Sequence, residues 1–172
     1  MICLSFHHIR LGGILEISLS QDGYNMDTQI AYQLFALHKE HVASVRGINI
    51  NSAVDYEDRC RVYYRAAHIT ILDLLLIKHR EIHETAFSKL PGKQAFFHRI
   101  LMKYNWPISE IKALSLAEVF LSLHEDLNYK SFDNEISDYF NGFLNRYDEF
   151  HFDDTIDSEW DPTLYQKIQQ HF

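Results

Sequence analysis

The 172-residue sequence is poor in the residues that cross-link, bend or break a chain, with two cysteines, three prolines and six glycines. Cys3 and Cys60 have no metal-type spacing and are too few for a disulfide framework, so we expect reduced thiols in a cytoplasmic protein. The glycines form no phosphate-binding loop, which argues against nucleotide binding by that route. No apolar run reaches the ~20 residues that cross a bilayer, and Arg10 follows the N-terminal one. We therefore expect neither a membrane-bound nor a secreted protein.

Basic residues are scarce in one region, and this region accounts for the net charge of −8. Between residues 125 and 161 only Lys130 and Arg146 are basic. The acids there are Glu125, Asp126, Asp133, Glu135, Asp138, Asp148, Glu149, Asp153, Asp154, Asp157, Glu159 and Asp161. Such a surface repels nucleic acid and attracts basic proteins at long range, so direct nucleic-acid binding by that face is not expected.

The length and the 47% hydrophobic content predict one globular domain with a substantial core. Residues 26–172 have helical periodicity, whereas residues 1–25 differ and contain a Gly12-Gly13 pair between two apolar runs. We interpret 1–25 as an N-terminal β-hairpin or extension. Alternatively, these residues are encoded upstream of the true start at Met26, because Gln21-Asp22 can be encoded with an AGGA ribosome-binding sequence.

The apolar spacing predicts an all-α, single-domain bundle of five or six helices around a long central helix. The expected ranges are 28–45, 53–85, a third helix containing 97–104, a kinked or divided helix over 109–127, a helix near 132–147 and a short one over 161–171. Ser52 with Asp55, and Ser115 with Glu118, have the spacing of N-terminal capping boxes. Leu72 and Leu75 should be fully buried in the longest helix.

One stretch, "RCRVYYRAAH", brings together residues suited to RNA cleavage. Arg61 and His68 are almost two helical turns apart and share a face with Arg65. A histidine can transfer a proton while an arginine holds phosphate charge. The pattern resembles the R-x(4–6)-H motif of HEPN ribonucleases, although Val62 stands where that family usually has a polar residue. The resemblance implies a helical ribonuclease, and a homodimer is compatible with it. The alternative is that the arginines pair with nearby acids such as Asp58.

Histidines at helical spacing raise the question of a metal site. His38 with His41, and His79 with His83 and Glu84, have spacings that zinc or a di-iron centre can use. A di-iron bundle needs Glu-x-x-His on two helices, and this strict pattern is missing. We predict no metal and no cofactor.

The stretch 145–161 mixes acids with aromatic residues that follow no helical period. Aromatic side chains anchor protein interfaces, and surrounding carboxylates steer a basic partner. The predicted partner-binding residues are Asp148, Glu149, Phe150, Phe152, Asp153, Asp154, Asp157, Glu159, Trp160 and Asp161. The function favoured by the sequence is neutralisation of a basic protein partner by occlusion, as by a bacterial immunity protein or antitoxin. The alternatives are the ribonuclease and a solvated loop whose rings pack on the protein.

Overall fold

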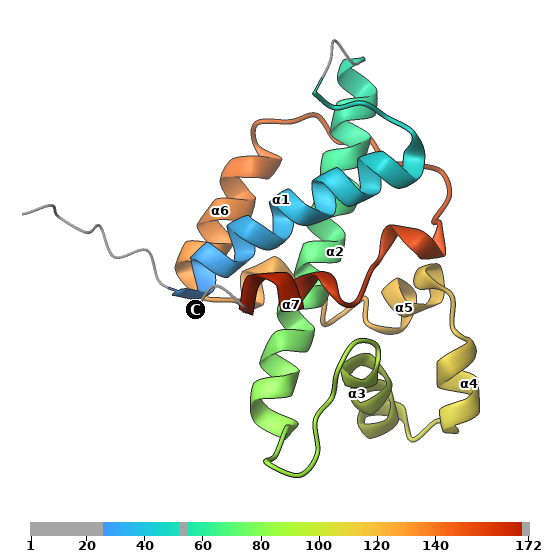
Figure 1. Ribbon diagram of the computed structural model, residues 1–172. Coiled ribbons are helices and arrows are strands. Elements are labelled where there is room, and N and C mark those ends of the chain that lie inside the picture. The colour runs from blue at the N-terminus through green and yellow to red at the C-terminus, as the bar shows by residue number, and fades with distance from the viewer. Residues whose placement is uncertain (1–25, 52–54, 170–172) are drawn as a thin grey trace, which may run out of the picture.

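The computed structural model describes residues 26–51 and 55–169, which are mostly helical and contain no strand (Figure 1). The elements are α1 (Met26–Arg46), α2 (Tyr56–His83), α3 (Gln94–Tyr104), α4 (Ile108–Ala113), α5 (Leu116–Ser122), η1 (Tyr129–Ser131), α6 (Asn134–Leu144), η2 (Asp157–Glu159) and α7 (Leu164–Gln169). The prediction of an all-α protein is confirmed for this part of the chain, whereas the predicted N-terminal hairpin lies outside it. None of the described helices is both long and apolar enough to span a membrane.

Side-chain caps set several of the helix starts. Asp55 accepts a hydrogen bond from the amide of Glu57 at the start of α2, and Ser115 and Glu118 form the predicted capping box of α5. Asn105 ends α3 in the left-handed conformation that asparagine tolerates. The divided helix expected over 109–127 is found as α4 and α5, and Pro107 without a side-chain cap precedes the first residue of α4.

The interior consists of two hydrophobic clusters, and α2 contributes to both. The first includes Leu72 with Phe96, Ile100 and Leu123 of later segments. The second includes residues of α1, α2 and α6, among them Leu34, Ile71, Ile136 and Phe140. Among the described residues, α2 therefore supplies side chains to both clusters.

The burial of α2 largely follows its sequence. Leu72 is inaccessible to solvent, as predicted, whereas Leu75 is half-buried and contacts both clusters. Full burial of Leu75 was therefore a wrong prediction: helical periodicity identifies an apolar face but not how completely its margins are covered.

The segment between α6 and α7 runs past the N-terminal half of α2 and then past the C-terminal end of α1 (Figure 1). We call residues 145–161 the acidic strap. It crosses α2, where the Tyr64 hydroxyl donates a hydrogen bond to the carbonyl of Tyr147. It then passes the C-terminal end of α1, where Arg46 bonds to Asp154. The acidic and aromatic residues of interest thus lie on a path of irregular backbone fixed at several points.

Candidate functional site: the acidic strap and its groove

Two arginines hold the end of the strap. Arg46 of α1 donates from Nε to Glu159 Oε1 at 2.5 Å, and Arg65 of α2 donates from Nη1 to Glu159 Oε2. The Glu159 side chain is completely buried, so its charge is stabilised by these two guanidinium groups rather than by water. Glu159 is 113 residues from Arg46 and 94 residues from Arg65 in the sequence. Its carboxylate therefore joins three segments that are distant along the chain.

The same arginines hold Asp154 and Phe152. Arg46 Nη1 lies 2.6 Å from Asp154 Oδ1, and Arg65 Nη2 donates to the Asp154 carbonyl at 2.9 Å. The hydrogen bond from Arg46 lowers the pKa of the Asp154 carboxyl below its ordinary value. The guanidinium of Arg46 also lies over the Phe152 ring, 4.0 Å from its centroid. This part of the strap consequently combines ion pairing with cation–π stacking.

Trp160 is fixed by a buried polar network. Its indole Nε1 donates to Asp73 Oδ1 at 3.0 Å, and His38 Nε2 lies 3.0 Å from the other carboxylate oxygen. His38 and Asp73 are fully buried, and Trp160 is 4% exposed. The indole ring belongs to the first hydrophobic cluster and contacts Phe96 edge-on. In the monomer, Trp160 stabilises the interior and offers no surface to a partner.

The ten predicted partner-binding residues fall into three groups by exposure. Asp148, Glu149, Asp153, Asp154 and Asp157 are exposed; Phe150, Phe152 and Asp161 are half-buried; Glu159 and Trp160 are buried. Several exposed carboxylates also have internal roles. Asp157, for example, accepts a hydrogen bond from the amide of Leu116 at 2.7 Å. The surface available to a partner is therefore mainly the first half of the strap, residues 148–153.

A groove of about 600 Å³ lies beside the strap and contains all three residues of the ribonuclease hypothesis. Arg61, Arg65 and His68 line it, together with Glu149 and His151 of the strap. The structure thus brings together the Arg/His stretch of α2 and the acidic strap, which sequence analysis had treated as separate candidates.

The groove residues are not arranged as a ready proton-transfer site. His68 stacks on Phe120 with ring centroids 3.9 Å apart. Burial, and then the nearby positive charge of Arg65, lower its pKa from 6.5 to about 4. Arg61 pairs with Glu57 and Asp58 of its own helix, both at 2.8 Å. The arginine charges are therefore already compensated, and His68 is neutral at pH 7.

The histidines considered as metal ligands make other contacts. His38 bonds to Asp73, and His41 Nε2 donates to the Ser158 carbonyl at 2.8 Å. His79 Nε2 lies 2.9 Å from His98 Nδ1, and the His83 ring packs beside both. Within the residues described, no three histidine, cysteine, aspartate or glutamate side chains are grouped so that they could hold a metal ion.

The residues that sequence reasoning missed are the partners of the strap. Arg46 and Asp73 carry its main contacts, and neither is among the candidate residues predicted from the sequence. The single available signal was a carboxylate in the middle of "ITILDLLLI", because a buried acid requires a partner.

Comparisons with known proteins assign no relationship, since no protein family, curated protein or solved structure matches the chain.

Proposed function

We propose that this chain is a small binding protein that neutralises a basic protein partner by covering it, most specifically as a toxin-neutralising immunity protein or antitoxin. In this proposal the helices form one bundle around α2, and the first half of the acidic strap faces the partner. The observation that supports the proposal is the exposed row of Asp148, Glu149 and Asp153 beside the half-buried rings of Phe150 and Phe152.

Rigidity of the strap favours a binding role. Its backbone is tied to α1 and α2 through Ser158, Tyr147 and Asp154, and its inner end through Glu159 and Trp160. A surface ordered before binding loses little conformational entropy when the complex forms. Exposed carboxylates on such a surface speed the encounter with a basic protein.

The expected interface is acidic at its rim and aromatic at its base. Phe150 lies near the Arg61 guanidinium, 5.8 Å from ring centroid to Cζ, and Phe152 packs against the first hydrophobic cluster. An arginine or lysine side chain of the partner would meet carboxylates first and an aromatic face next.

The test begins with the immobilised chain and a cell extract at low salt. A basic protein retained there is identified, purified and mixed with the chain. We expect a complex of defined stoichiometry in which the partner's own activity, or its toxicity on expression, is suppressed. The absence of a saturable complex with any basic protein, or a complex that leaves the partner active, would contradict the proposal.

A helical ribonuclease is the second candidate, supported by one observation: Arg61, Arg65 and His68 line the same groove. A metal-independent RNA cleavage that is abolished by His68→Ala but retained by His124→Ala would favour it. His124 is an exposed histidine of the described chain and lines no part of this groove. The neutralising protein should cleave no RNA.

A further inference from the structure

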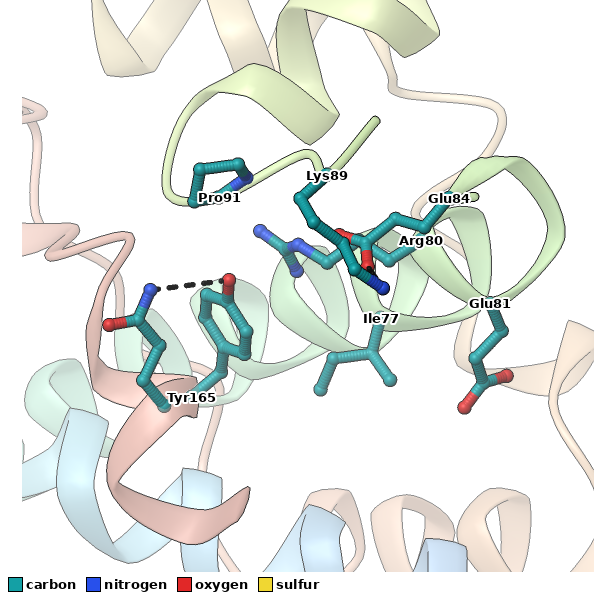
Figure 2. A pocket seen from close by; sticks show the side chains of 8 residues that line it. Ile77, Arg80, Glu81, Glu84, Lys89, Pro91 and Tyr165 are labelled. Atoms are coloured by element: carbon teal, nitrogen blue, oxygen red, sulfur yellow. Dashed lines mark hydrogen bonds and ion pairs between the residues drawn. The ribbon is translucent and has the colours of Figure 1, made fainter. Parts of the chain in front are cut away.

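A second cavity, of about 670 Å³, lies away from the acidic strap (Figure 2). It is bounded by the last turns of α2, the connection from α2 to α3, and α7. Arg80, Lys89 and Tyr165 supply polar groups to its wall, and Ile77 and Pro91 supply apolar ones. The cavity therefore offers both charge and an apolar surface to a small molecule.

Arg80 is a buried cation without an acidic partner. Only 6% of the residue is exposed, and it forms no ion pair with any residue that the structure describes. Its Nε and Nη2 donate to the carbonyls of Leu90 and Gly92 at 3.0 and 2.9 Å, whereas Nη1 has no hydrogen-bond partner among residues 26–51 and 55–169. The guanidinium lies over the Tyr165 ring, with Cζ 3.9 Å from the centroid.

The acids around the cavity do not neutralise Arg80 directly. Glu84 accepts a hydrogen bond from the amide of Leu90 and pairs with Lys89 at 3.3 Å. The carboxylate of Glu81 is directed away from the Arg80 guanidinium in Figure 2. Burial lowers the pKa of Arg80, and the more distant charges of Asp73 and Glu84 offset only part of this effect.

A buried charge with an unused donor is costly unless a counter-charge reaches it. Arg80 lines the cavity, so an anion bound there lies near its charge, and the attraction is stronger than in bulk water because the surroundings are less polar. Lys89 at the rim adds a second cation. The hydroxyl of Tyr165 accepts from Gln166 at 3.4 Å, which leaves its own proton free to donate to a ligand oxygen.

We propose that this cavity binds a small organic anion, with its carboxylate or phosphate group toward Arg80 and Lys89 and its apolar part against Ile77 and Pro91. This site is independent of the proposed neutralising function, because none of the strap residues lines it.

The test uses the full chain and two probes, inorganic phosphate and sodium propionate, each compared with sodium chloride at matched ionic strength. Binding is followed by NMR, through the Arg80 side-chain Nε–H and the backbone amides of Leu90 and Tyr165. We expect saturable shifts with a Kd in the millimolar range for at least one probe. Stronger binding of phosphate would assign the site to phosphorylated ligands, and stronger binding of propionate to carboxylates.

Variants distinguish binding in this cavity from nonspecific attraction of anions to the protein surface. Arg80→Met should abolish saturable binding, but it also removes two hydrogen bonds to the connection. Lys89→Ala therefore serves as a second variant and should weaken binding about fivefold, equal to about 1 kcal/mol. Lys112→Ala removes the same charge from an exposed site on α4 and should leave binding unchanged. Absence of saturable shifts with both probes, or equal binding by Lys89→Ala and Lys112→Ala, would overturn the proposal.

Discussion

The two halves of the acidic strap have similar compositions but different surroundings. Residues 154–161 include Glu159 and Trp160, which are buried against α1 and α2, besides the exposed Asp154 and Asp157, whereas residues 148–153 include no buried residue and leave three carboxylates exposed. The difference follows from the arginines beneath. Arg46 and Arg65 pair with Glu159 in residues 154–161, the inner half of the strap. Arg61 lies near Phe150 in residues 148–153, the outer half, and is already paired with Glu57 and Asp58. Glu159 is thus buried where two arginines compensate its charge, whereas the carboxylates of residues 148–153 stay in solvent.

Trp160→Ala should have the largest effect on stability. It removes a buried ring from the first hydrophobic cluster and the donor to Asp73, and we expect a loss of about 3–5 kcal/mol in the free energy of unfolding. Trp160→Phe keeps most of the apolar contact and should cost about 1–3 kcal/mol, chiefly because an Asp73 oxygen loses its partner. Urea denaturation measures both. A loss below about 1 kcal/mol for Trp160→Ala would refute the interior role.

Glu159→Gln should come next, with an expected loss of about 3 kcal/mol, because it leaves Arg46 and Arg65 without their shared negative charge. Asp153→Asn, an equivalent change in the outer half, is the matched control and should alter stability by less than about 0.5 kcal/mol. If the two substitutions lower the free energy of unfolding by similar amounts in urea denaturation, the two halves of the strap do not differ in their contribution to stability.

His68, which lines the groove beside the strap, should make the free energy of unfolding depend on pH. His68 has a folded-state pKa of about 4 against 6.5 for the unfolded chain, so the unfolded state binds its proton first as pH falls. The contribution of His68 is complete above pH 6.5 and decreases toward pH 4, by about 2 kcal/mol at pH 5. His79, whose pKa is also lowered to about 4 by burial and then by nearby positive charges, acts in the same direction.

Replacing His68 tests this dependence. His68→Gln should reduce the loss of unfolding free energy between pH 7 and pH 5, whereas His124→Gln, which removes only a minor cause of the lowered His68 pKa, should preserve most of it. If His68→Gln leaves the pH profile of urea denaturation unchanged, the surroundings of His68 do not lower its pKa as described.

The smallest effect on stability is expected in the outer half of the strap. Asp148→Lys with Asp153→Lys should change the free energy of unfolding by no more than about 0.5 kcal/mol per site, because both side chains are exposed. Thermal denaturation provides the measurement. A large destabilisation would mean that these carboxylates serve the fold and are not available to a partner.

Local features of the structure could be predicted from the sequence. Apolar spacing gave the helical class, and the capping pattern of Ser115 and Glu118 gave the start of α5. The contacts that fix the strap could not be predicted, because Asp73 and Trp160 are 87 residues apart and Arg46 and Glu159 are 113 apart. Such pairings depend on the arrangement of the helices, which no local pattern encodes.

The dependence on distant contacts also explains why the sequence predicts a partner-binding role for Trp160. A tryptophan among acids resembles an exposed anchor in sequence, because the buried acid that accepts a hydrogen bond from its indole N–H lies far away in the chain, on α2. The exposed carboxylates required no such distant information, since charged residues are exposed by default.

The association rate with the purified basic partner, measured across a range of salt concentrations, tests the role of the outer half most directly. Asp148→Lys with Asp153→Lys should slow association at least about tenfold at low salt and flatten its salt dependence. Glu40→Lys with Glu110→Lys makes the same change in net charge at exposed sites outside the strap, and should have a much smaller effect. Equal slowing by the two double variants would show that total charge, rather than the strap, governs the encounter and would contradict the proposed binding face.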